Sequence, residues 1–246
     1  MAVEKGQRVM SKHNALDLNQ FRVLTFDCYG TLIDWESGIL NALKPVFIAH
    51  QVKIGQDAAL ELFGELESEQ QREYKPYRAV LENVLAGIGE RLGFTPTDRE
   101  KQAFGESVRD WPPFPDTVNA LYALKGKYKL VILSNVDDDL FAHSARKLQV
   151  AFDDVITAQQ CKSYKPSLNN FRIAQRRIGV SSDKWLHVAQ SLYHDIAPAK
   201  QLGLHTVWVN RRWDKPGSGA TKLTEVTPDL EVKSLGELAE IVESKK

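Results

Sequence analysis

The 246-residue sequence has few of the residues that would indicate a disulfide framework, a membrane segment or a charged partner. Its two cysteines, Cys28 and Cys161, are too few to cross-link a chain of this length, which favours a reducing, cytoplasmic compartment. No apolar run approaches the roughly 18 residues that cross a bilayer, so we expect no membrane partner. Basic and acidic residues balance at 32 each, without a block of one sign, which argues against nucleic acid as a partner.

The first 20 residues are polar and lack the apolar centre of a signal peptide. We interpret residues 1–20 as a loosely ordered N-terminal extension. The rest of the chain is long enough to bury a substantial core, as one large domain or two smaller ones.

The pattern that follows the first predicted strand, residues 21–26, is helical. Leu60, Phe63 and Leu66 recur at helical spacing, as do several apolar residues between 81 and 92. Thr97 followed by Glu100 is a capping-box signature, and the helix it opens is expected to end near Trp111, before a proline-rich run. We therefore predict an inserted α-helical cap over residues 37–112.

Strands and helices alternate beyond the prolines. Continuous apolar runs at 129–133, 155–156, 185–189 and 205–209 predict strands, with a short one near residue 230, and helical segments separate them. This alternation is typical of a parallel sheet covered on both faces. The predicted fold class is α/β, with a Rossmann-like parallel-sheet core built from residues 21–36 and 113–246.

Polar residues follow four of these predicted strands. Because parallel strands bring their carboxyl ends to one edge of the sheet, where ligands bind in such folds, we expect these side chains to share a site. The candidate catalytic residues are Asp27, Thr31, Ser134, Asn135, Lys165 and Asp195.

Each candidate has a chemical role that its residue type allows. Asp27 is suited to act as a carboxylate nucleophile that forms a covalent ester, and Lys165 would keep it ionised. Thr31 can hydrogen-bond Asp27 and cap the helix that follows. Asp195 can hold Lys165, orient water or bind a metal, or only begin its helix.

Ser134 and Asn135 are assigned both catalytic and substrate-binding roles. Their hydroxyl and amide groups can donate hydrogen bonds to an oxyanion or to a departing anion. The alternative is that they only cap the next helix. Among the remaining polar residues, we expect His187 to be a hydrogen-bonded core residue and Arg211 and Arg212 to form a solvated loop.

Four segments in this order are similar to the four motifs of the haloacid dehalogenase-like (HAD) hydrolase superfamily. They are Asp27-Cys28-Tyr29-Gly30-Thr31, Ser134-Asn135, Lys165-Pro166 and Asp195. The resemblance covers nearly all of the chain beyond the N-terminal extension. It implies a Rossmann-like core, Asp27 as the nucleophile and a cap that closes over the substrate.

Tyr29 favours carbon over phosphorus as the atom that Asp27 attacks. Phosphatases of the superfamily usually carry a second Asp at this position, as a general acid and base. Tyrosine, with an ordinary pKa near ~10, does not replace it easily at neutral pH. Asp-x-Tyr-Gly-Thr resembles the type II (S)-2-haloacid dehalogenases, which implies displacement of a leaving group from C2 of a small carboxylic acid.

No cofactor is expected from this resemblance, although Asp27 and Asp195 leave weak Mg²⁺ binding possible. Tyr29 and Trp35 are predicted to line the substrate pocket. The sequence departs from the dehalogenase pattern at Leu192 and Phe171. The cap arginine of that family is also unassigned, since neither Arg72 nor Arg78 matches its position.

Three alternative functions stay open at this point. One is a Mg²⁺-dependent phosphatase acting on a small phosphoester. Another is a hydrolase that opens a strained ring acid such as azetidine-2-carboxylate by the same displacement. The third is a non-catalytic interaction protein that keeps the fold. A homodimer is the expected assembly, because dimers are common in the family.

Overall fold

The computed structural model describes residues 16–215, 217, 219–222 and 224–244. Most of the predicted extension of residues 1–20 therefore lies outside the described residues. The part that is described contains a 3₁₀ turn, η1 (Leu18–Gln20), in which Leu18 is buried. The Tyr128 hydroxyl donates a hydrogen bond to the Leu18 carbonyl, so this turn is fastened to the domain.

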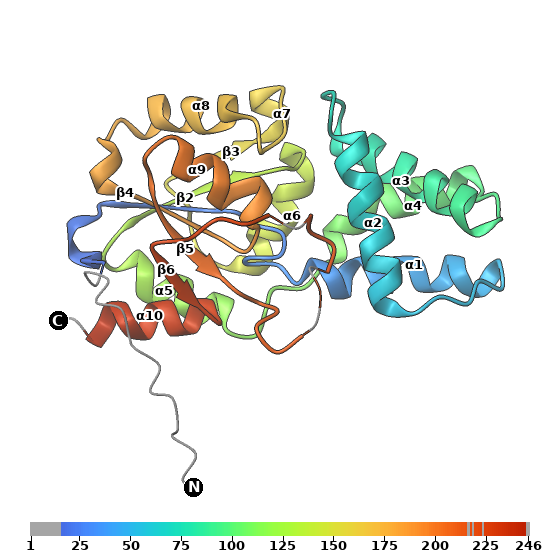
Figure 1. The fold of residues 1–246 in the computed structure, drawn as a ribbon, viewed down its shortest axis with the longest axis horizontal. Coiled ribbons are helices and arrows are strands. Elements are labelled where there is room, and N and C mark those ends of the chain that lie inside the picture. The colour runs from blue at the N-terminus through green and yellow to red at the C-terminus, as the bar shows by residue number, and fades with distance from the viewer. Residues whose placement is uncertain (1–15, 216, 218, 223, 245–246) are drawn as a thin grey trace, which may run out of the picture.

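The core is a six-stranded parallel sheet in the order β3-β2-β1-β4-β5-β6 (Figure 1). Its strands are β1 (Val23–Phe26), β2 (Lys129–Ser134), β3 (Asp154–Thr157), β4 (Trp185–Ala189), β5 (His205–Val209) and β6 (Leu230–Val232). The strand order reverses direction beside β1, which places β1 at the centre with its carboxyl end at the switch point of the fold. The predicted α/β, Rossmann-like core is confirmed.

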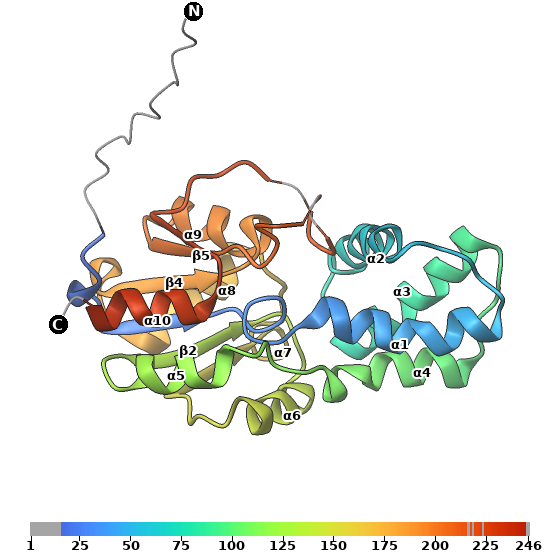
Figure 2. The same ribbon diagram turned by 90° about the horizontal axis from the view of Figure 1, so that it is seen from below.

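Helices cover both faces of this sheet (Figures 1 and 2). They are α5 (Thr117–Lys125), α6 (Asp138–Leu148) and α10 (Leu235–Ser244) towards one face, and α7 (Ala158–Cys161), α8 (Leu168–Ile178) and α9 (Ala197–Gln201) towards the other. Alternate residues of β1 face these two layers. Leu24 and Phe26 join the larger apolar cluster, whereas Val23 packs in the second cluster with residues of α8 and α9.

Four further helices form a layer beside the core (Figure 2). They are α1 (Trp35–Ala49), α2 (Gln56–Gln70), α3 (Tyr77–Leu92) and α4 (Asp98–Glu106). Thr97 and Glu100 make the predicted capping box at the start of α4. The helix ends earlier than expected, because the chain tightens at Glu106 into a 3₁₀ segment, η2 (Ser107–Asp110), before the prolines.

Hydrogen bonds and an ion pair hold this helical layer against the strand ends. Asp137, after β2, accepts the Tyr77 backbone N–H at 2.8 Å, and the Tyr164 hydroxyl donates to the Lys75 carbonyl at 2.7 Å. On the other side, Arg212 and Glu36 form an ion pair of 2.6 Å. The helices therefore lie closed over the edge where the strands end.

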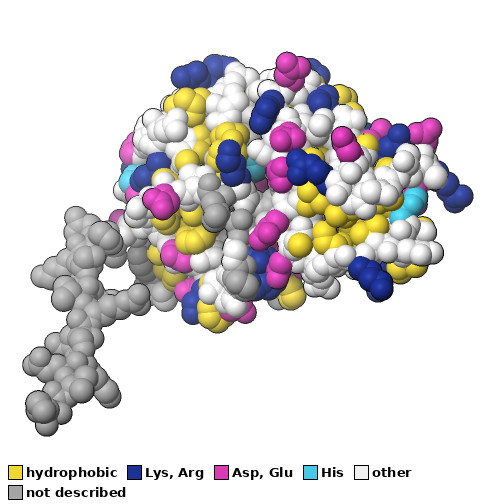
Figure 3. Space-filling view, turned by 45° about the vertical axis from the view of Figure 1, so that its right-hand side comes forward, with side chains coloured by type: hydrophobic (Ala, Val, Ile, Leu, Met, Phe, Trp, Pro, Cys, Tyr) yellow, Lys and Arg dark blue, Asp and Glu magenta, His cyan; other side chains and the backbone are white. Residues whose placement is uncertain are grey.

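The surface mixes both signs of charge. Lysine, arginine, aspartate and glutamate side chains are interspersed on the face shown in Figure 3, consistent with the balanced composition. Within the described residues, no helix combines the length and the apolar character needed to cross a membrane.

Candidate active site

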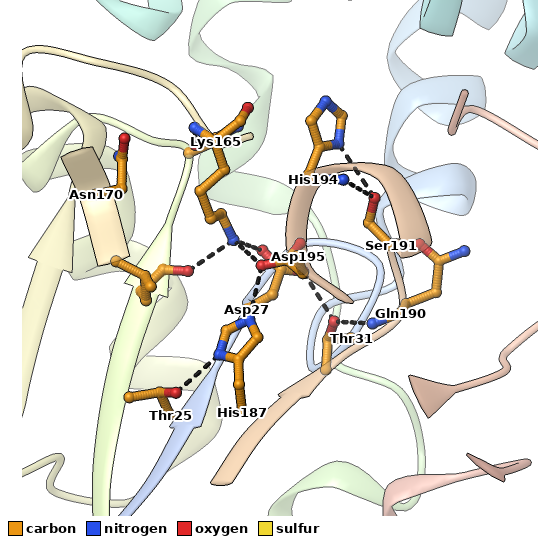
Figure 4. Close-up of polar contacts among 12 residues, drawn as sticks. Thr25, Asp27, Thr31, Lys165, Asn170, His187, Gln190, Ser191, His194 and Asp195 are labelled. Atoms are coloured by element: carbon orange, nitrogen blue, oxygen red, sulfur yellow. Dashed lines mark hydrogen bonds and ion pairs between the residues drawn. The ribbon is translucent and has the colours of Figure 1, made fainter. Parts of the chain in front are cut away.

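Lys165 is the centre of the site (Figure 4). Its ammonium nitrogen lies 3.0 Å from Asp27 Oδ1, 2.6 Å from Asp195 Oδ1 and 2.8 Å from the Leu133 carbonyl oxygen. All three side chains are buried, with Lys165 and Asp195 each only 1% exposed. An ammonium group has three N–H donors, so these three acceptors use all of them.

The loop after β1 positions Asp27. The Thr31 hydroxyl donates to Asp27 Oδ2 at 2.8 Å and accepts the Gln190 backbone N–H at 2.9 Å. Between them Gly30 has a positive φ of 93°, and a Cβ there would lie 2.9 Å from the Trp35 indole nitrogen. Glycine is required because the turn needs both the left-handed backbone and the close approach.

Asn135 fixes the backbone of Lys165. Its Oδ1 accepts the Lys165 N–H at 2.8 Å, and its Nδ2 donates to the Lys165 carbonyl at 3.0 Å. The Asn135 side chain thus satisfies both polar groups of the residue that carries the ammonium. In the structure Asn135 positions Lys165 rather than capping the following helix.

A chain of buried side chains fixes Asp195. His187 Nε2 lies 2.9 Å from Asp195 Oδ1, and His187 Nδ1 lies 2.7 Å from the Thr25 hydroxyl. Because an ionised carboxylate only accepts, Nε2 carries the proton, and Thr25 donates to Nδ1. Thr25 in turn accepts the Trp185 indole N–H at 2.6 Å, and Phe171 packs edge-on against the His187 ring.

The helix that carries Asp195 begins earlier and is wider than expected. The sequence predicts an α-helix from residue 195, whereas a π-helical turn, η4 (Leu192–Ile196), precedes α9. Such turns are frequent at functional sites. Here the turn contains Asp195 itself, next to its contacts with Lys165 and His187.

Burial and the neighbouring charges shift the pKa values of the paired side chains in opposite directions. Burial raises the pKa of Asp27, although Lys165 and the Thr31 hydrogen bond act to lower it. Burial would also raise the pKa of Asp195, but Lys165 and His187 lower it overall. For Lys165, burial lowers the pKa, and the two carboxylates raise it by more. Lys165 therefore stays charged.

The site opens into a small cavity of about 30 Å³ under the helical layer. Its lining includes every candidate named from the sequence except Thr31, which lies behind Asp27: Asp27, Tyr29, Trp35, Ser134, Asn135, Lys165 and Asp195. Two buried atoms in this lining, Ser134 Oγ and Asp195 Oδ2, have no hydrogen-bond partner among the described residues. They are available to a substrate or to a reacting water.

Tyr29 and Trp35 shape the cavity wall. The Tyr29 hydroxyl forms a hydrogen bond of 3.0 Å with Ser144 Oγ on α6, and its ring packs edge-on against Trp111. Burial raises the pKa of Tyr29 well above its usual range. Trp35 packs edge-on against Phe63 of α2.

Sequence reasoning missed several residues of the lining. They are Glu67, Gln71, Tyr77 and Thr221, whereas Gln190, Ser191 and His194, which also line the cavity, follow the fourth predicted strand as the sequence indicates. Glu67 had one readable signal: it lies at helical spacing from Phe63, within an apolar face. In this lining Lys165 is the one lysine or arginine. Arg78 pairs with Glu106 and Asp139 instead.

Arg211 corrects the expectation of a solvated loop. Its side chain is 8% exposed, donates to the Thr31 carbonyl from Nε and Nη2, and pairs with Asp116 at 2.7 Å. The guanidinium also lies over the Phe114 ring, 4.1 Å from its centroid. Arg212 is buried as well. Their partners come from distant segments, so the local sequence gave no sign of them.

Three of the four carboxylate oxygens of Asp27 and Asp195 are engaged by other side chains. Both Oδ1 atoms of Asp27 and Asp195 are bonded to Lys165, and Asp27 Oδ2 accepts from Thr31. Within the described part of the chain, no group of three or more His, Cys, Asp or Glu side chains is placed to share a metal ion. A Mg²⁺ ion prefers near-octahedral oxygen coordination, commonly with carboxylates.

Comparisons with known proteins agree with this architecture. A family model described as haloacid dehalogenase-like hydrolase matches residues 21–203. The (S)-2-haloacid dehalogenase 4A of Burkholderia cepacia is 27% identical over 81% of this chain and 87% of its own length. A glyceraldehyde 3-phosphate phosphatase of Methanocaldococcus jannaschii is 31% identical over 88% and 98%. The solved structure of L-2-haloacid dehalogenase from Xanthobacter autotrophicus covers 92% of this chain and 100% of that chain, with a TM-score of 0.76 and 21% identity.

Proposed function

The chain belongs to the haloacid dehalogenase-like hydrolase family, and we propose that it displaces a leaving group from C2 of a small carboxylic acid, with Asp27 as the nucleophile. The observation that carries this proposal is the setting of Asp27. Its carboxylate lies at the carboxyl end of β1, is held by Lys165 and Thr31, and lines the cavity. A buried carboxylate with few solvating partners is a stronger nucleophile than one in water.

The first step is a displacement at carbon. An Asp27 oxygen attacks C2, the bond from C2 to the leaving group breaks, and an ester of Asp27 forms. Lys165 compensates the charge of Asp27 before the attack and that of Asp195 throughout. A halide other than fluoride leaves without needing a proton.

The second step is hydrolysis of that ester. Water attacks the carbonyl carbon of Asp27, which restores the carboxylate and releases a 2-hydroxy acid. Asp195 Oδ2 is buried at the cavity without a partner among the described residues, so it is the acceptor assigned to this water. His187 and Lys165 hold the other oxygen of Asp195 in place.

The substrate carboxylate needs hydrogen-bond donors. Ser134 Oγ is a hydroxyl in the lining without a partner among the described residues, and Trp35 lines the same cavity. The cavity is small, which favours a compact acid. We assign Ser134, Asn135, Tyr29 and Trp35 to the substrate side of the cavity.

A phosphatase is the second candidate, favoured by the 31% identical glyceraldehyde 3-phosphate phosphatase. Two features of this chain argue for carbon instead. The Tyr29 hydroxyl is engaged by Ser144, and Lys165 occupies one oxygen of each of the two carboxylates, Asp27 and Asp195.

Halide release separates these candidates. We expect chloride from (S)-2-chloropropionate at a rate that EDTA does not change, and no phosphate from a panel of small phosphoesters. Azetidine-2-carboxylate in the same panel tests the ring-opening alternative. The proposal would be overturned if EDTA abolished a release of phosphate and if no haloacid released halide. No turnover of any compound would instead support the interaction-protein reading.

The Asp27→Asn variant tests the nucleophile. It keeps the shape of the side chain but removes the attacking carboxylate, so turnover should fall by roughly 10⁴-fold or more. A single turnover of the wild type in H₂¹⁸O should place one ¹⁸O in Asp27, measured by peptide mass spectrometry. Label found only in the product would contradict attack on the ester carbonyl.

A further inference from the structure

Glu67 is a buried carboxyl group on the apolar face of α2. The buried residues of this helix are Ala59, Leu60, Phe63, Leu66 and Glu67, and only the last carries an ionisable group. Glu67 is 3% exposed. Burial of a carboxylate without a cation is costly, so its presence on this face calls for a chemical reason.

The two oxygens of Glu67 differ in their surroundings. Oε1 accepts the Tyr77 hydroxyl at 2.6 Å, and Tyr77 is itself buried on α3. Oε2 has no hydrogen bond with any of the described residues, and the side chain lines the same cavity as Asp27. A proton on Glu67 therefore belongs on Oε2, where it can reach a group bound in the cavity.

The charges around the cavity favour that proton. Burial raises the pKa of Glu67 to about 7, the Tyr77 hydrogen bond opposes this, and the charge of Asp27 adds to it. The other titratable groups that face the cavity are Asp27, Tyr29, Tyr77, Lys165, His194 and Asp195. Lys165 is the only permanent cation among them, and it is bonded to both aspartates.

Other proton donors in the lining are engaged or too weak. The three N–H groups of Lys165 are taken by Asp27, Asp195 and the Leu133 carbonyl. The Tyr29 hydroxyl is bonded to Ser144. Burial lowers the pKa of His194 to about 4, so it is neutral at pH 7 and a poor acid. A carboxylic acid with a pKa near the working pH is the better general acid.

We propose that Glu67 is the general acid of the first step, and that it serves those small acids whose C2 substituent departs only with a proton. This inference rests on the proposed function, with Asp27 attacking C2. The class includes fluoride and the ring oxygen of a strained ring such as oxirane-2-carboxylate. Chloride and bromide fall outside it because they leave as stable anions.

Glu67 loses one proton and regains one proton in each turnover. As Asp27 forms its bond to C2, the leaving atom takes the electron pair of the broken bond and the proton of Glu67. Fluoride leaves as HF, whereas a ring oxygen becomes a hydroxyl group on the neighbouring carbon. Water then hydrolyses the ester, and the proton released as the Asp27 carboxylate re-forms returns to Glu67.

Glu67→Gln tests this role with the shape retained, because the amide oxygen can still accept from Tyr77. Chloride or bromide release from 2-halopropionates should change less than tenfold. Fluoride release from 2-fluoropropionate, and ring opening of oxirane-2-carboxylate, should fall by about 10²- to 10⁴-fold, the usual contribution of general acid catalysis. Glu69→Gln on the same helix is the matched control, since Glu69 is exposed and lies outside this cavity.

The pH profile supplies an independent readout. Wild-type defluorination should decline on the alkaline side with an apparent pKa near 7, and this decline should be absent from the residual activity of Glu67→Gln. Difference infrared spectroscopy should show a protonated carboxyl that the variant lacks. Equal losses on the fluoro and bromo substrates, or no loss on either, would overturn the assignment. Absence of halide release by the wild type would instead reject the proposed function.

Discussion

The side chain of Asn135 holds both polar backbone groups of Lys165, accepting its N–H at 2.8 Å and donating to its carbonyl at 3.0 Å. The two residues are 30 positions apart and follow different strands. The relationship explains how a lysine on a loop keeps its ammonium between two carboxylates. It also separates Asn135 from Ser134, which lines the cavity and whose hydroxyl has no partner among the described residues.

Asn135→Ala should weaken both activity and stability. Two backbone groups of Lys165 lose their partner, which costs about 1–3 kcal/mol for each one that stays buried. Small displacements of the ammonium should lower kcat by about 10²-fold. Halide release and urea unfolding measure the two effects.

Asn135→Asp gives the sharper comparison, because it keeps the acceptor for the Lys165 N–H but turns an oxygen towards the Lys165 carbonyl. We expect it to be at least as impaired as Asn135→Ala. Asn169→Ala is the control, since Asn169 is exposed and donates to the Cys161 carbonyl outside the site. Full activity in Asn135→Asp would show that the amide donor is unimportant.

Arg211 is a positioning residue for the loop that contains Thr31. Its Nε and Nη2 donate to the Thr31 carbonyl at 3.2 and 2.9 Å, while Nη1 pairs with Asp116. Lysine cannot make this set of contacts from one ammonium group. In Arg211→Lys we expect kcat to fall about 10- to 100-fold with KM nearly unchanged, because Arg211 does not line the cavity.

Asp116→Asn separates the ion pair from the loop contacts. It removes the charge that faces Arg211 but leaves the two bonds to the Thr31 carbonyl. We expect stability to fall slightly, measured by thermal unfolding, with kcat close to wild type. If Asp116→Asn lost as much kcat as Arg211→Lys, the ion pair rather than the loop contact would be responsible.

The positions of the strands along the chain, and the gathering of candidate residues at their carboxyl ends, could be predicted from the sequence, because both follow from local patterns. The apolar runs mark β1, β2 and β4, and the residue after each run is polar. The capping box at Thr97 is a pattern of four residues, and it was predicted correctly.

What the sequence could not reveal depends on contacts between distant segments. Glu67 is one of several acidic residues in its segment of the sequence, and only the folded position of α2 places it in the cavity lining. Arg211 has its partner 95 positions away. The π-helical turn before α9 has no local marker, since periodicity distinguishes helix from strand but not one helical geometry from another.

Glu67 should make the stability of the protein fall as the pH rises. Its pKa is raised from 4.5 to about 7 in the folded protein, chiefly by burial. Between those values the folded state binds more protons than the unfolded state, so the free energy of unfolding decreases with pH. The contribution is fully present below pH 4.5 and is lost as the pH passes through about 7. A difference of 2.5 units corresponds to about 3 kcal/mol at most.

Glu67→Gln isolates this contribution, because glutamine stays neutral at every pH and keeps the acceptor for Tyr77. Urea unfolding of both proteins from about pH 4 to about pH 9 gives two stability curves. Between pH 4.5 and about pH 7, the free energy of unfolding of the variant should rise relative to that of the wild type. Above that range the difference between the two proteins should level off. Contributions from the groups around Lys165 are common to both proteins and cancel in that difference. Parallel curves would mean that the folded state does not hold a proton on Glu67, and the general-acid role would lose its physical basis.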